Sequence, residues 1–170
     1  MSSANQAQTP PNTTSSAFKV EAGDGRMGRS LYVVGDDIRV KISSQDTNSA
    51  FAVLDGRTQP RHGPPLHLHH RQDEWWYVLE GRLLFVVDGQ EIVAGTGDTV
   101  FAPKGTRHTH LNIGAMPARY IVAVVPGGLD IFFEELSAVV PPGTVPDPAS
   151  LAPLFRKHGL ELLGPPLGAR

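Results

Sequence analysis

Six of the seven histidines fall between residues 62 and 110. His67 and His69 belong to the run Pro-Leu-His-Leu-His, and alternate residues of a strand point to the same face. Their two imidazoles, about 7 Å apart along such a strand, can converge on one ion. Glu74 follows five residues after His69 and can supply a carboxylate once the chain turns back. The spacing predicts a metal site of nitrogen and oxygen ligands.

A second segment brings further histidines. Residues 97–112 contain a Pro and Gly turn that delivers His108 to the start of a strand. His110 and Asn112 share the face of His108, and they are candidates for a hydrogen bond to a ligand or to the substrate. The alternative for His110 is a histidine satisfied at the rim of a barrel. His62 and His70 are expected in exposed loops, and His158 has no expected role.

Strand parity extends to the aromatic residues. If Glu74 points inward, Trp76 does so too, while Trp75 and Tyr77 pack on the opposite side. An apolar pocket for a flat substrate could draw on five aromatic residues: Trp76, Phe85, Phe101, Phe132 and Phe133. Ordinary core packing is the alternative for each of them. Four basic residues flank the motifs and either steer an anionic substrate or are solvated loop charges: Arg61, Arg71, Lys104 and Arg107.

The elements that must position these residues are short. From about Ser30, β-favouring runs alternate with turn signals, and Asp88-Gly89 is a hairpin turn. The expected strands are 31–34, 38–42, 49–54, 75–80, 83–87, 91–94, 98–102, 108–112 and 118–125. Their spacing indicates a sandwich or barrel. Helical spacing follows at Leu129–Ala138, then a proline connector (Pro141, Pro142, Pro146, Pro148), then a second helix from Ala149 to His158 that Gly159 ends.

Composition narrows the function. The chain has 170 residues, which suits one domain, and no cysteine, which excludes a disulfide scaffold, Cys-ligated zinc and thiol catalysis. A net charge of -2 argues against a nucleic-acid partner. No apolar run is long enough to span a membrane. Residues 1–17 lack the features of a secretory signal and are expected to be a flexible tail, so the cytoplasm is the expected compartment.

The two histidine segments resemble the two motifs of the cupin superfamily of small β-barrels. The first motif is matched by His67, His69, Glu74 and Gly81, with its upstream glycine displaced to Gly63. The second is matched throughout by Gly97, Pro103, Gly105, His108 and Asn112. The resemblance implies an all-β fold, a double-stranded β-helix (jelly-roll) barrel at residues 18–126, with a C-terminal helical extension at 127–170. It also implies one divalent metal, Fe, Mn, Ni, Co, Cu or Zn, on His67, His69, Glu74 and His108.

Residues 30–166 as a whole resemble single-domain cupins of the quercetin 2,3-dioxygenase type. This resemblance implies a metal-dependent dioxygenase acting with O₂ on a small hydroxylated aromatic or enol substrate. Glu74 would then act both as a ligand and as the general base that takes the proton of a substrate hydroxyl. A homodimer is expected by the same resemblance. Two alternatives stay open: a non-oxidative isomerase or lyase that uses the ion as a Lewis acid, and a small-molecule-binding cupin without catalysis.

Overall fold

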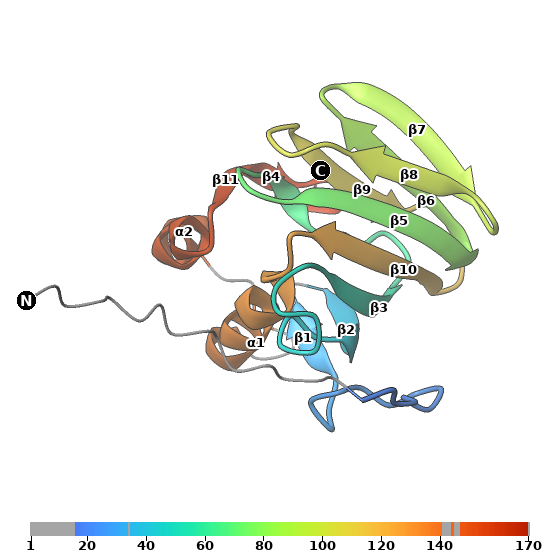
Figure 1. Cartoon of the computed structure of the whole chain (residues 1–170). Coiled ribbons are helices and arrows are strands. Elements are labelled where there is room, and N and C mark those ends of the chain that lie inside the picture. The colour runs from blue at the N-terminus through green and yellow to red at the C-terminus, as the bar shows by residue number, and fades with distance from the viewer. Residues whose placement is uncertain (1–15, 34, 141–143, 145–146, 170) are drawn as a thin grey trace, which may run out of the picture.

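Alternating buried and exposed residues build two antiparallel sheets in a computed structural model that describes residues 16–33, 35–140, 144 and 147–169. The first sheet has the order β1 (Leu31–Val33), β2 (Asp36–Ile42), β3 (Ala52–Thr58), β10 (Ala118–Val125), β5 (Asp73–Glu80), β8 (Thr99–Ala102). The second has the order β11 (Leu160–Pro166), β4 (Pro65–His69), β9 (His108–Asn112), β6 (Arg82–Val87), β7 (Gln90–Gly95). Figure 1 shows the sheets facing each other as a jelly roll, and the predicted all-β fold is confirmed.

The core lies between the sheets because each strand turns its apolar residues inward. On β10 the inward residues are Tyr120, Val122 and Val124, and the residues between them are only partly buried. On β5 the inward residues are Glu74, Trp76 and Val78, whereas Trp75 and Tyr77 are exposed. The parity predicted for this strand is therefore confirmed, and it directs a carboxylate into the barrel.

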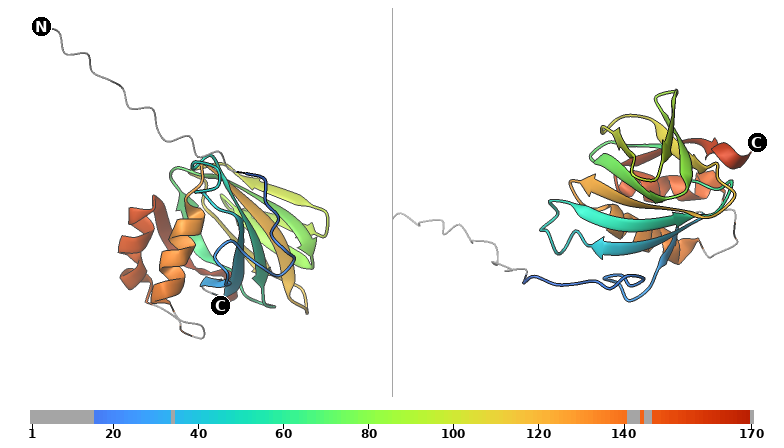
Figure 2. Two further views of the ribbon diagram at one scale, coloured as in Figure 1. Left: turned by 60° about the horizontal axis from the view of Figure 1, so that its bottom comes forward. Right: turned by 90° about the vertical axis from the view of Figure 1, so that its right-hand side faces the viewer.

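Two helices, α1 (Leu129–Val139) and α2 (Pro148–Lys157), stand together on one side of the sheets (Figures 1 and 2). Asp130 of α1 is buried and accepts hydrogen bonds from the backbone N–H and the hydroxyl of Ser44. In α2, Asp147 caps the N-terminus by accepting from the N–H of Ala149. The rings of Phe132 and Phe155 meet edge to face at 4.9 Å, so the two helices share one apolar contact above the barrel.

The C-terminal segment is not only helical. Gly159 ends α2 with a positive φ of 74°, as the sequence predicts, but residues 160–166 then form the unpredicted strand β11. This strand pairs with β4, with Leu160 opposite His69 and Leu162 opposite His67. A short 3₁₀-helix (Leu167–Ala169) follows it. The C-terminal segment thus supports the strand that carries two predicted ligands.

One predicted strand begins and ends at other residues in the structure, and some predicted segments lie outside the described residues. The strand expected at residues 49–54 lies at Ala52–Thr58, because Asn48 and Ser49 take positive φ in a turn. Most of the expected tail, Val34, and the connector residues Pro141, Pro142 and Pro146 lie outside the described residues. In the part of the chain that is described, no helix has the length and apolar character needed to cross a membrane.

Candidate metal centre

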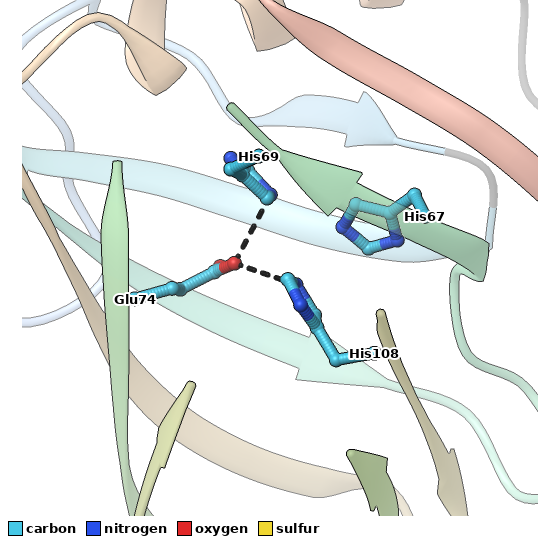
Figure 3. A group of neighbouring side chains, drawn as sticks. All are labelled: His67, His69, Glu74 and His108. Atoms are coloured by element: carbon cyan, nitrogen blue, oxygen red, sulfur yellow. Dashed lines mark hydrogen bonds and ion pairs between the residues drawn. The ribbon is translucent and has the colours of Figure 1, made fainter. Parts of the chain in front are cut away.

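Three strands converge on the four predicted metal ligands. His67 and His69 come from β4, Glu74 from β5 and His108 from β9, and Figure 3 shows the side chains turned toward one another. One ligand atom from each residue can be chosen so that all four lie within 4.8 Å of one another. The pairing of β4 with β9 sets His67 directly opposite His108. The second sheet thus supplies the histidines and the first supplies the carboxylate.

Glu74 joins two of the histidines. Its Oε2 lies 3.0 Å from His108 Nε2, within hydrogen-bond geometry, and 3.1 Å from His69 Nε2 (Figure 3). The contact with His69 has ion-pair distance but is not aligned as a hydrogen bond, since that nitrogen has no hydrogen-bond partner. The rings of His69 and His108 are stacked, with centroids 5.2 Å apart.

Backbone carbonyls orient two of the imidazoles. His67 Nδ1 lies 2.7 Å from the carbonyl oxygen of Pro65, and His108 Nδ1 lies 3.0 Å from that of Thr106. A carbonyl only accepts, so Nδ1 carries the proton, and in a neutral ring Nε2 presents its lone pair to the centre of the group. This second contact to a backbone oxygen is the usual support of a metal-bound histidine.

The donors fit a divalent transition ion. The pKa of His67 lies well below its usual value, mainly because the ring is buried and further because His108 and His69 are close. This imidazole is therefore neutral. Burial by itself would raise the pKa of Glu74, but the nearby charges of His69 and His108 and the hydrogen bond with His108 hold it well below its usual value. His69 is buried and neither of its ring nitrogens has a hydrogen-bond partner, and an ion would satisfy one of them. Three imidazoles and a carboxylate suit the ions from Mn to Zn.

The site opens on a cavity of about 60 Å³. Besides the four ligands, Trp76 and Val122 of the first sheet line it, and α1 and α2 contribute Phe132 and Phe155. The helices therefore close the barrel above the metal group with aromatic rings. At roughly 10–15 Å³ for each water-sized occupant, the cavity holds four to six such occupants.

The structure separates the candidate pocket residues. Trp76 lines the cavity, with its ring 5.4 Å from that of His108, and His110 lines it too. Phe132 and Phe133 line it from α1. Phe85 is buried behind the wall, where its ring contacts Trp76 and His110 at 5.2 and 5.5 Å.

The expectation for Phe101 is wrong. It pairs with Trp75 on the outer side of the first sheet and is 54% exposed, because Val100 and Ala102 take the inward positions of β8. Asn112 is fully buried but does not line the cavity. Its amide donates to the carbonyl oxygens of Thr58 and Met116 and accepts from the N–H of Gly114, so it stabilises a turn.

The remaining histidines lie away from the ligand group. His62 is exposed, and His70 is exposed and pairs with Glu161, as expected for outward-facing residues. His158 lies 3.2 Å from Glu135. Two polar residues that line the cavity were missed by the sequence analysis: Asp36, which reads as part of a turn, and Tyr120, which reads as one apolar position of β10.

Comparisons with known proteins agree with this architecture. Residues 49–124 match the family model of the cupin domain. Over 120 residues the chain is 27% identical to quercetin 2,3-dioxygenase of Bacillus subtilis, a match that covers 70% of this chain and 34% of that longer protein. The chain thus spans about a third of the length of this relative.

Solved structures share the fold. The polyketide cyclase RemF of Streptomyces resistomycificus superimposes with a TM-score of 0.57 at 22% identity, over 65% of this chain and 80% of that one. KdgF from Halomonas sp. superimposes with a TM-score of 0.54 at 18% identity, over 62% and 94%. At these identities the likeness concerns the fold alone. Residues 49–124 therefore form a cupin domain, and the two sheets have the cupin fold.

Proposed function

We propose that this protein is a metal-dependent dioxygenase that acts on a small hydroxylated aromatic or enol substrate with O₂. The observation that carries the proposal is the group of His67, His69, Glu74 and His108 at the wall of a cavity otherwise lined mostly by apolar side chains. The similarity to a quercetin 2,3-dioxygenase over 70% of the chain supports the same activity class.

The four residues would hold one divalent transition ion, which supplies Lewis acidity and redox chemistry when bound. The low pKa of Glu74 makes it a carboxylate at neutral pH, so it can accept the proton of a substrate hydroxyl that enters the cavity. Trp76, Val122 and Phe132 line the cavity around this position with apolar surface, which strengthens the electrostatic contacts there.

The size of the cavity favours small substrates within this class. About 60 Å³ is well below the roughly 150 Å³ of an engineered protein cavity that binds benzene. A three-ring flavonol does not fit beneath α1 and α2 as they lie here. We therefore propose an enol or enediol of five or six non-hydrogen atoms as the substrate type to test first.

Oxygen consumption tests the activity. The purified protein is loaded separately with Fe, Mn, Ni, Co, Cu and Zn and offered small β-diketones, reductone-type enediols, catechols and flavonols. O₂ uptake with at least one enol in at least one metal form is the expected result. No uptake in any form would overturn the proposal. Product formation under argon would replace it with Lewis-acid isomerase or lyase chemistry on the same ligands.

The variant Glu74→Gln tests whether Glu74 acts as the general base. Glu74→Gln keeps three imidazole ligands and loses the base, so we expect much of the metal to remain and turnover to fall at least a hundredfold. Glu80→Gln, an exposed glutamate on the same strand, is the matched control and should leave both unchanged. Unchanged turnover in Glu74→Gln would exclude the base role.

The homodimer stays a prediction, which analytical ultracentrifugation tests.

A further inference from the structure

A second polar cluster lines the same cavity. Asp36 from β2, His110 from β9 and Tyr120 from β10 are all buried there. The Tyr120 hydroxyl donates to Asp36 Oδ2 at 2.8 Å, and His110 Nε2 lies 3.5 Å from the same oxygen. The rings of His110 and Tyr120 meet edge to face at 5.2 Å. Asp36 lies outside the segment that matches the cupin domain model.

The cluster is incomplete as it stands. Asp36 Oδ1 and His110 Nε2 are both buried without a hydrogen-bond partner. Buried polar atoms in folded proteins are nearly always paired, because an unpaired one loses its contacts with water and gains nothing. Both residues line the same cavity, so a polar group bound beside them there could supply the missing contacts.

The cluster lies at a defined spacing from the metal group. His108 and His110 are two residues apart on β9, so their side chains leave the same face about 7 Å apart. Trp76 and Phe85 bridge this interval, since Trp76 contacts the His108 ring and Phe85 contacts the His110 ring. The cavity therefore has two polar ends and an apolar wall between them.

We propose that Asp36, His110 and Tyr120 form a subsite that binds a hydroxyl group at the far end of a small substrate, whose other oxygen lies at the metal group. This inference rests on the proposed function, which places substrate in this cavity. A hydroxyl that donates its one proton to Asp36 Oδ1 can accept from His110 when Nε2 carries the ring proton, so it satisfies both atoms. Tyr120 is a positioning residue, because its hydroxyl holds the other oxygen of Asp36.

The packing around Tyr120 supports this positioning role. Tyr120 lies opposite Gly56 of β3, and a Cβ built on Gly56 would come within 2.4 Å of the tyrosine ring. The absence of a side chain at residue 56 thus gives the ring its place beside Asp36. The pKa of Tyr120 lies well above its usual value, mainly because the side chain is buried and also because Asp36 is close. Its hydroxyl therefore stays protonated and remains a donor.

The test uses two acids of equal size, 3-hydroxypropionate and butyrate, which differ only by a terminal hydroxyl in place of a methyl. Cobalt(II)-loaded protein is titrated with each, and the visible absorption of the bound ion reports occupancy. We expect 3-hydroxypropionate to bind about tenfold more tightly, the ratio typical of a hydrogen bond to a charged group. Equal affinities would overturn the subsite and leave the cluster a structural network, as would no binding of either acid by the loaded protein.

Variants assign the preference to Asp36. In Asp36→Asn the amide oxygen keeps the Tyr120 contact and an NH₂ replaces Oδ1, so the tenfold ratio should fall to about twofold or less. Asp55→Asn, which changes a buried aspartate of the neighbouring strand outside the cavity, should leave the ratio unchanged. An unchanged ratio in Asp36→Asn would overturn the proposal. Tyr120→Phe removes only the positioning hydroxyl and should lower the ratio about threefold with cobalt uptake intact.

The same titrations separate this inference from the proposed function. Calorimetry with both acids is repeated on the protein freed of cobalt. If the four proposed ligands do not bind metal, the protein takes up no cobalt, and the affinities for the two acids are the same with and without cobalt treatment. The ratio between the acids depends on the cluster of Asp36, His110 and Tyr120 and not on the metal, so it should persist without the metal. Its absence in both forms would overturn the subsite whatever the fate of the metal site.

Discussion

Glu74 Oε2 lies 3.0 Å from His108 Nε2, although the two residues belong to opposite sheets of the barrel. Burial by itself would lower the pKa of His108, but the hydrogen bond to Glu74, its charge and the Thr106 carbonyl raise it. A cation placed at this nitrogen competes with the proton, so metal uptake is expected to release protons and to weaken as the pH falls. The contact also links the two sheets at the site.

Removal of His69 should abolish metal binding. His69→Ala deletes an imidazole whose ring is buried in the centre of the group, and we expect bound metal to fall from about one equivalent to below a tenth. His70→Ala, the adjacent exposed histidine, is the matched control and should bind as the wild type does. Elemental analysis of both proteins measures this. Full retention of metal by His69→Ala would remove His69 from the ligand set.

The ion pair of Asp46 and Arg26 should make stability depend on acid pH. The hydrogen bond from Arg26 lowers the pKa of Asp46 to about 2, with a smaller contribution from the hydrogen bonds of Ser43. Burial acts in the opposite direction but is outweighed. An unfolded aspartate titrates near 3.9. Because the folded pKa is depressed, the stabilisation is fully present above about pH 4 and is lost as the pH falls toward 2.

Asp46→Asn should therefore lower the free energy of unfolding by about 1 kcal/mol at pH 7, and by much less near pH 2. Urea unfolding at both pH values measures the difference. Asp37→Asn removes an exposed pair with Arg39 and should cost less than about 0.5 kcal/mol at either pH. An Asp46→Asn effect that is the same at both pH values would contradict the assigned pKa.

Phe132 should hold α1 on the barrel and limit the size of the cavity. Phe132→Ala removes a ring that is 2% exposed and contacts Phe133 and Phe155, so we expect a loss of about 3–5 kcal/mol in unfolding free energy. The enlarged cavity should also admit catechol to the cobalt-loaded protein. Ile131→Ala on the exposed side of the same helix should cost less than about 1 kcal/mol. Equal losses for the two variants would show that α1 does not close the site.

Gly56→Ala should displace Tyr120. The added Cβ would lie 2.4 Å from two ring atoms of Tyr120, so the ring or the strand must move. We expect a destabilisation of about 1–3 kcal/mol, measured by thermal unfolding, and a reduced preference for the hydroxy acid. Gly164→Ala is the control on β11, where a Cβ would meet Leu66 at an ordinary 3.6 Å. No change in Gly56→Ala would mean that the packing tolerates the Cβ without moving Tyr120.

Strand parity explains which residues could be predicted. The alternation of β5 placed Glu74 and Trp76 inside and Trp75 outside, because the two faces of a strand follow from the pleat alone. Phe101 was misplaced because parity within β8 does not reveal which of its faces meets the core. For Asn112 the parity was right, but the carbonyls it binds come from Thr58 and Met116, and only the fold brings these together.

The sequence by itself was enough to indicate the cupin motifs, most of the strands and the four candidate donors, since these depend on residue types at short spacings. Only the tertiary structure decided the size of the cavity, the addition of β11 to the sheet that carries the histidines, and the meeting of Asp36 with Tyr120. Asp36 and Tyr120 are 84 residues apart, and β3 lies between their strands. Their contact depends on strand order and on the missing side chain at Gly56, which no local pattern reveals.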